Sequence, residues 1–154
     1  MSTEPIHNIN DLFNELQKRI NKDNNLKSHI NLLKQYNGTD WKNYVRFSDH
    51  SYHREIIFRN ELFDILIISW KQGQQTKIHD HPDHGCLMRV LQGKLCENIY
   101  LNKNGLTLIG SNIIDTDNIG HREGSSIIHN IKSLNDTVSL HIYSPGYYVP
   151  KLYD

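Results

Sequence analysis

The sequence lacks the features that stabilise secreted domains or attach proteins to membranes. Only two cysteines, Cys86 and Cys96, occur in 154 residues, too few for a disulfide framework. The first ten residues contain no basic segment followed by an apolar run, and no stretch approaches the roughly 18 apolar residues of a membrane span. We therefore expect a soluble, cytoplasmic protein that does not contact a membrane.

An excess of charge of either sign is also missing. Lysine and arginine total 17, and aspartate and glutamate total 17, so the formal net charge is zero. Without a basic field, the chain has no electrostatic means of holding nucleic acid or anionic lipid. We therefore expect a monomer whose partners are small molecules, with no nucleic acid among them.

The N-terminal part of the chain has the periodicity of amphipathic helices. The length suits one domain with its own core, and no repeat or long linker divides it. Between residues 9 and 36, apolar side chains recur at spacings of three and four. This pattern predicts two helices, separated near residues 22–25, with Asn10 as the N-cap of the first. We expect this segment to pack on the rest of the domain.

The remainder of the chain has the texture of a β protein. Short β-branched and aromatic runs follow one another, separated by glycine or polar residues. The predicted strands are Leu62–Trp70, Leu87–Gln92, Lys94–Tyr100, Leu106–Ile109, Ser126–Ile131 and Val138–Tyr143. Gly93 lies between two of them as a hairpin signal. We predict a mainly β fold, with an antiparallel β-barrel behind the N-terminal helices.

Two closely spaced histidines are the first indication of a functional site. His79 and His81 are separated by one residue, Asp80. Side chains at positions i and i+2 of a strand project to the same face, so these two imidazoles can bind one metal ion while Asp80 points away. The pair therefore predicts half of a metal site.

The residues around this pair resemble a cupin motif. Five residues separate Gly73 from His79, and six separate Cys86 from Gly93. The resemblance implies a single cupin domain, a jelly-roll-like β-barrel, over residues 1–154. Many cupins carry a glutamate ligand at the position of Cys86. A site of neutral histidines leaves the charge of the metal uncompensated, which favours a substrate thiolate as an anionic ligand.

The third metal ligand is predicted to be His129. It lies in a β-like alternation, Ser-Ile-Ile-His-Asn-Ile, that would hold its ring fixed. The other candidate, His121, lies in the polar segment 118–124, which we predict to be a loop with a solvated side chain.

A second polar group follows in the strand predicted at the C-terminal end of the domain. Strict alternation places Ser139, His141 and Tyr143 on one face and apolar residues on the other. If that face meets solvent, the strand is an ordinary amphipathic one. If it faces the barrel interior, the three side chains form a proton relay that ends on a phenol.

Taken together, these motifs resemble those of the cysteine dioxygenases, which are mononuclear iron cupins. The segments that carry the resemblance are Trp41–Tyr44, Tyr52–Arg54, Trp70, His79–His81 with Cys86, Leu91–Gly93, His129 and Val138–Pro145. The resemblance implies that His79, His81 and His129 hold one Fe(II) per chain. It also implies that both atoms of O2 are added to the sulfur of L-cysteine, giving cysteine sulfinate.

The resemblance also implies a clamp for the substrate carboxylate. Arg54 matches the arginine that grips it, a role that suits the planar fork of a guanidinium. Tyr52 would point to the same side if this segment is extended. Arg59 is a rival clamp. In the family, a tyrosine and the clamp arginine are separated by one residue, and this pattern favours Arg54.

Other members of the site are implied in the same way. Cys86 and Tyr143 match the two residues that many animal members of the family join by a thioether bond. Ser139 and His141 match the residues that orient the tyrosine hydroxyl. The bond between Ser144 and Pro145 matches one that is cis in the family. Cys96, by contrast, is interpreted as a small buried hydrophobe.

Two alternative functions remain open. One is a dioxygenase for 3-mercaptopropionate or a similar thiol acid, against which both Arg54 and Cys86 argue. The other is a cupin that binds zinc or nickel without oxygenase activity, because three histidines also make a good zinc site. The metal that copurifies, and oxygen consumption in the presence of cysteine, would separate these functions.

Overall fold

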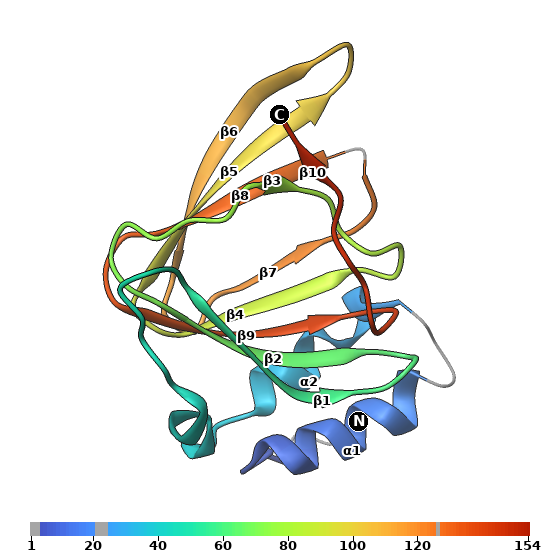
Figure 1. Cartoon of the computed structure of the whole chain (residues 1–154). Helices are drawn as coiled ribbons and strands as arrows, with labels where there is room; N and C mark the ends of the chain where they lie inside the picture. The colour runs from blue at the N-terminus through green and yellow to red at the C-terminus, as the bar shows by residue number, and fades with distance from the viewer. Residues whose placement is uncertain (1–3, 21–24, 126) are drawn as a thin grey trace.

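Two five-stranded antiparallel sheets face each other and form the body of the molecule (Figure 1). The computed structural model describes residues 4–20, 25–125 and 127–154. The first sheet has the order β1 (His53–Arg59), β2 (Asp64–Trp70), β9 (Thr137–Tyr143), β4 (Cys86–Gln92) and β7 (Ile119–Arg122). The second has the order β10 (Leu152–Tyr153), β3 (Ile78–His79), β8 (Ile127–Ser133), β5 (Lys94–Asn102) and β6 (Leu106–Asp115). The predicted mainly β barrel is confirmed.

The helices precede the barrel and lie beneath the first sheet (Figure 1). They are α1 (Ile9–Ile20), the 3-10 turn η1 (Leu26–His29) and α2 (Ile30–Gln35); a second 3-10 turn, η2 (Asp40–Tyr44), leads to β1. The predicted break near residues 22–25 falls largely outside the described residues. The prediction of Asn10 as N-cap is wrong: the side chain of Asn8 accepts a hydrogen bond from the backbone N–H of Asp11 at 2.8 Å.

The first sheet is buried on both faces, and this determines which of its side chains reach the barrel interior. On the outer face, Ile65 and Leu140 pack against helical residues such as Leu12 in one core cluster. On the inner face, Ile68 and Trp70 belong to a second cluster inside the barrel. Because side chains alternate along a strand, the neighbours of the outward-facing residues of β9 point inward.

Two local predictions are wrong, because the local sequence does not indicate which strands pair with each other. Gly93 does not form a hairpin, since β4 belongs to the first sheet and β5 to the second. It forms a tight corner with a φ of 87°, where an added Cβ would lie 2.4 Å from Oγ1 of Thr137. The segment 118–124, predicted to be a loop, contains β7, which pairs with β4.

The peptide bond between Ser144 and Pro145 is cis, as the resemblance implied. No helix among the described residues is long and apolar enough to cross a membrane.

Candidate metal centre

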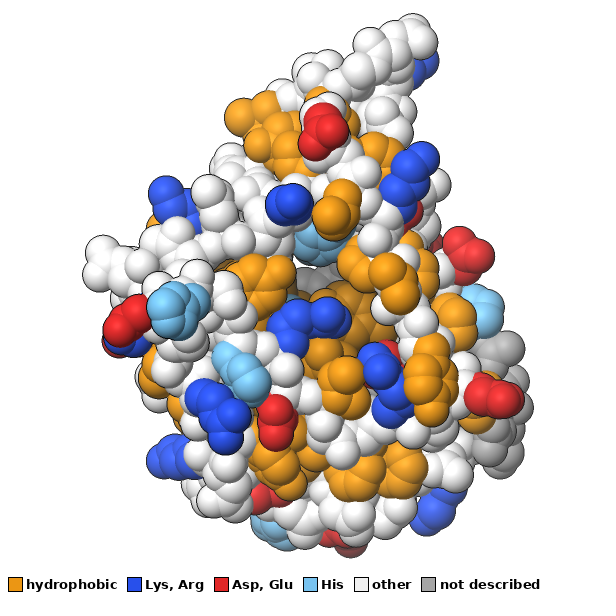
Figure 2. Space-filling model, in the orientation of Figure 1, with side chains coloured by type: hydrophobic (Ala, Val, Ile, Leu, Met, Phe, Trp, Pro, Cys, Tyr) orange, Lys and Arg blue, Asp and Glu red, His pale blue; other side chains and the backbone are white. Residues whose placement is uncertain are grey.

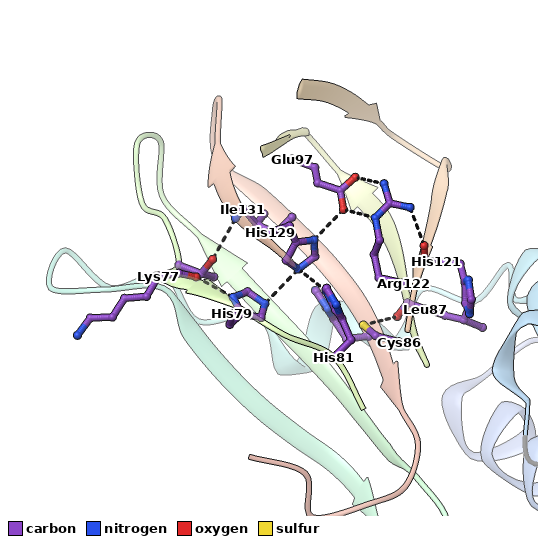
Figure 3. A network of polar contacts seen from close by, with 12 residues as sticks. Lys77, His79, His81, Cys86, Leu87, Glu97, His121, Arg122, His129 and Ile131 are labelled. Carbon is purple, nitrogen blue, oxygen red and sulfur yellow. Dashed lines mark hydrogen bonds and ion pairs between the residues drawn. The ribbon is translucent and has the colours of Figure 1, made fainter. Parts of the chain in front are cut away.

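Three imidazoles from the second sheet converge inside the barrel (Figure 3). His79 lies on β3 directly opposite His129 on β8, and His81 follows β3. Nε2 of His129 lies 3.0 Å from Nε2 of His81 and 3.1 Å from Nε2 of His79. One ligand atom from each ring lies within 4.8 Å of the others, so the structure brings the three predicted ligands together.

The hydrogen-bond acceptors beside Nδ1 determine the tautomers of two of these rings. Nδ1 of His79 lies 2.7 Å from the carbonyl oxygen of Lys77, and Nδ1 of His129 lies 2.7 Å from a carboxylate oxygen of Glu97. Both oxygens can only accept, so each Nδ1 carries a proton, and Nε2 is the nitrogen of each ring that can bind a metal. These two Nε2 atoms, 3.1 Å apart, are therefore placed to bind the same cation.

The same arrangement fits a metal ion in spacing and in protonation state. Nitrogen ligands at bond lengths of about 2.1 Å and right angles lie about 3 Å apart. Burial, reinforced by the neighbouring His129, lowers the pKa of His79 to about 4 and that of His81 to about 2. At neutral pH these two rings are uncharged and can bind a metal without first losing a proton.

Glu97 supports this centre, and the sequence interpretation missed it. It lies on β5, is 4% exposed, and accepts hydrogen bonds from His129 and, through both oxygens, from Arg122 on β7 at 2.8 and 3.0 Å. Burial opposes ionisation, but the hydrogen bond and charge of His129 and the charge of Arg122 keep the pKa of Glu97 below its ordinary value. The available signal was a carboxylate that shares one face of a predicted strand with Leu95 and Ile99.

The polar face of β9 points into the barrel and not to solvent. Ser139 is 0% exposed and His141 is 3% exposed. The indole Nε1 of Trp70 donates to Oγ of Ser139 at 2.9 Å, and this Oγ lies 2.7 Å from Nε2 of His141. Nδ1 of His141 lies 3.4 Å from the hydroxyl of Tyr143.

These contacts orient the proton of the tyrosine hydroxyl. Among the described residues, the Ser139 hydroxyl finds its acceptor at Nε2 of His141, which leaves the proton of that ring on Nδ1. Nδ1 then donates to the oxygen of Tyr143, so the phenol proton points away from His141, and Cys86 is a hydrogen-bond partner of this phenol. Burial raises the pKa of Tyr143 well above its ordinary value, and the phenol keeps this proton.

Cys86 and Tyr143 lie opposite each other on β4 and β9. The thiol is buried, and burial raises the pKa of Cys86 to about 12. The two side chains are also linked by a hydrogen bond. The structure thus places the two residues of the expected thioether side by side, both uncharged.

Arg54 lies on β1 opposite Ile68, an interior residue of β2, and therefore points into the barrel. Tyr52 lies nearby and stacks on the ring of Trp70, with 4.7 Å between ring centroids. In the part of the chain that the structure describes, no carboxylate pairs with the guanidinium of Arg54. Arg54 lines the cavity and is itself exposed, so this cation lies where an anionic ligand can reach it from solvent.

The rival arginine has a structural role. The guanidinium of Arg59 binds Asp64 through two hydrogen bonds of 3.0 and 3.1 Å, and it lies 4.8 Å from the ring centroid of Tyr147. Arg59 does not line the cavity, although Asp64 does.

The metal centre opens onto a cavity of about 330 Å³, seen as the central hollow in Figure 2, where basic and apolar side chains line the opening. The lining includes the three histidines, Arg54, His141 and Tyr143. One water molecule occupies about 30 Å³ of liquid, so the cavity has room for a small organic molecule.

His121 does not join the centre. The sequence predicted that His121 lies in a loop with a solvated side chain. This prediction is wrong, because His121 lies on β7 and its side chain is only 15% exposed. It is paired with Leu87, whose side chain packs on the helical side of the sheet. His121 therefore points away from the cavity, and Nε2 lies 3.9 Å from a carboxylate oxygen of Glu123.

Comparison with known proteins identifies relatives along the whole chain. The family model described as "Cysteine dioxygenase type I" matches residues 2–154. Cysteine dioxygenase type 1 of Danio rerio is 27% identical over 158 aligned positions, which cover 95% of this chain and 79% of the relative. The protein of the same name from Bos taurus is 29% identical over 119 positions, covering 72% of this chain. The match spans only 60% of the bovine protein.

Solved structures support the fold. A Klebsiella pneumoniae protein with a double-stranded β-helix domain superposes with a TM-score of 0.62 at 16% identity, covering 74% of this chain and 94% of that one. A cupin superfamily protein from Desulfitobacterium hafniense gives a TM-score of 0.52 at 13% identity, covering 64% and 82% of the two chains. The expected cupin fold is confirmed.

The contact between Glu97 and His129 predicts how metal binding should respond to loss of charge. In Glu97→Gln the amide oxygen can still accept from Nδ1 of His129, but the negative charge that makes this ring a stronger ligand is gone. We expect the affinity for Co²⁺, measured by titration of the metal-free protein, to fall about 10- to 100-fold.

Glu15→Gln, on α1 and remote from the cavity, is the matched control and should bind Co²⁺ as the parent does. Equal Co²⁺ affinities for the Glu97→Gln variant and the parent, with both proteins folded by circular dichroism, would contradict the role of Glu97.

Proposed function

Because the chain belongs to the cysteine dioxygenase type I family, we propose that it is a mononuclear iron enzyme that adds both atoms of O2 to the sulfur of L-cysteine. The product is cysteine sulfinate. In this reaction the S–H bond is broken and two S–O bonds form; sulfur loses four electrons and O2 gains four, so no other reductant is needed. The observation that carries the proposal is a site of three histidines, without a carboxylate ligand, beside an unpaired Arg54.

His79, His81 and His129 would hold the Fe(II), with one ion per chain. When bound, the ion supplies a Lewis acid and a source of electrons for O2 chemistry. Because all three ligands are neutral, they leave the positive charge of the ion for the substrate to offset. Cys86, at the position where other cupins have glutamate, lies beside Tyr143 and is not among the side chains whose ligand atoms converge. The site therefore favours a substrate that brings its own negative sulfur.

Arg54 would bind the substrate carboxylate. A guanidinium offers two parallel hydrogen bonds to a carboxylate, and its charge does not depend on pH. Tyr52, which is held by stacking on Trp70, forms part of the same wall. Anchoring the carboxylate here while the sulfur lies at the histidines fixes the orientation of the substrate.

Tyr143 would donate a hydrogen bond to the reacting groups. The contacts through Ser139 and His141 leave the phenol as a donor, because His141 occupies its oxygen as an acceptor, and its raised pKa keeps the phenol protonated throughout the neutral range. Ser139 and His141 act by orienting Tyr143. The monomeric state and the cytoplasmic location expected from the sequence stay predictions.

The proposed activity is tested with metal-free protein loaded with Fe(II) under anaerobic conditions. We expect added L-cysteine followed by air to give cysteine sulfinate, detected by mass spectrometry with both oxygens labelled from ¹⁸O2, and one O2 consumed per cysteine. Oxidation of 3-mercaptopropionate in preference to cysteine would favour the related thiol acid dioxygenase. Tight binding of zinc or nickel with no oxygen uptake would favour a non-oxygenase cupin.

Arg54→Ala should raise the KM for L-cysteine about tenfold or more, because a charged hydrogen-bonding partner of the carboxylate is lost. Iron content should not change, since Arg54 does not contact the ligand nitrogens. Steady-state oxygen uptake and metal analysis measure both quantities. Arg19→Ala, on the surface of α1, is the control and should keep the KM of the parent. If Arg54→Ala also has the KM of the parent, Arg54 does not bind the substrate carboxylate.

A thioether between Cys86 and Tyr143 should form during turnover, because the two side chains lie together beside the metal centre. Forming the C–S bond breaks the S–H bond of Cys86 and one ring C–H bond of Tyr143, and O2 takes up the two electrons and two protons. The intact mass should therefore fall by about 2 Da, and a peptide map should recover the two residues in one linked species. Cys86→Ser should show no such change. A map in which both residues remain unmodified after turnover would refute the crosslink.

A further inference from the structure

The C-terminal segment forms one wall of the cavity. It leaves β9 of the first sheet, crosses the mouth of the barrel and joins the second sheet as β10, where Leu152 pairs with His79 (Figure 1). Tyr148, Pro150 and Leu152 line the cavity, whereas Val149 between them is 83% exposed. Three side chains at alternate positions of this segment thus line the cavity without being metal ligands, and Leu152, which is 54% exposed, lies at its rim.

Asp80 fixes this segment in place. The residue lies between His79 and His81 and points to the other side, as alternation requires. Its carboxylate accepts hydrogen bonds from the hydroxyl of Tyr148 and from the backbone N–H of Lys151, the latter at 2.8 Å. The backbone N–H of Asp80 in turn donates to the carbonyl oxygen of Lys151 at 3.1 Å. Asp80 is only 8% exposed, so these bonds are made away from water.

We propose that Tyr148, Pro150 and Leu152, held in position by Asp80, form a specificity wall that limits the size of the thiol admitted to the metal centre. The inference rests on the proposed function and deepens it. Across the barrel from this wall, Arg54 on the first sheet anchors the carboxylate. A thiol longer than cysteine must therefore find room for its extra carbon against rigid apolar groups.

The volume of the cavity does not by itself exclude thiols larger than cysteine. The cavity of about 330 Å³ corresponds to about ten water molecules, which is more than the seven non-hydrogen atoms of cysteine need. Selectivity must therefore come from how the walls are placed. A single methylene changes selectivity by about 10- to 200-fold in a hydrophobic pocket, so a wall of this kind is sufficient to separate cysteine from homocysteine.

The test compares kcat/KM for L-cysteine and L-homocysteine in iron-loaded variants. Leu152→Ala removes apolar contact, and Tyr148→Phe keeps the ring but loses the bond to Asp80. We expect the preference for cysteine over homocysteine to fall about tenfold in the first variant and at least threefold in the second. Iron content should equal that of the parent in both variants, since neither side chain is a metal ligand.

Matched controls separate this effect from general loosening of the fold. Leu108→Ala removes a leucine of similar exposure, 57% against 54% for Leu152, from the outside of the second sheet. Tyr147→Phe changes the neighbouring, 60% exposed tyrosine. Both controls should keep the substrate preference of the parent.

A binding measurement gives a readout that is independent of turnover. Cobalt-loaded protein without O2 is titrated with each thiol, and binding is followed by the absorption of the cobalt–thiolate pair. In Leu152→Ala, the ratio of the dissociation constant of L-homocysteine to that of L-cysteine should fall. The factor should equal the one by which the preference in kcat/KM for cysteine falls. Unchanged ratios in both wall variants would overturn the specificity wall. If the parent itself binds and oxidises no thiol, the proposed function fails instead.

Discussion

The convergence of imidazole nitrogens at the centre of the barrel is the constraint on which the rest of the site depends. Two Nε2 atoms face each other at 3.1 Å, with their protons held on the far side by Lys77 and Glu97. The surrounding structure must hold these two nitrogens close together. A strand pair with His79 opposite His129 provides the frame, and burial keeps His79 and His81 uncharged at neutral pH.

The two sheets contribute different residues to the site. The second sheet provides the ligands and Glu97, while the first provides Arg54, Cys86, Tyr143 and the hydrogen bonds that orient the phenol. The first sheet can do so because the helices cover its other face with apolar contacts. Polar residues on alternate positions of β9 are then forced into the interior, where each finds a partner.

Much of this site could be predicted from the sequence, because strand alternation and motif spacing are local. They indicated His79, His81 and His129, and they placed the polar residues of β9 on one face. What failed depended on which strands meet in space. The corner at Gly93 was predicted to be a hairpin, and the strand around His121 was predicted to be a loop. Glu97 was missed because its partners come from β8 and β7, distant in the sequence.

The outward direction of Asp80 has a consequence for how relatives of this protein could diverge. Its neighbours on either side are fixed by the metal, so this strand tolerates little change in any descendant that keeps the same chemistry. The residues of the C-terminal segment that line the cavity are not metal ligands, so they are free of this constraint. Substitutions in this segment would change the shape of the cavity while the three histidines are inherited unaltered.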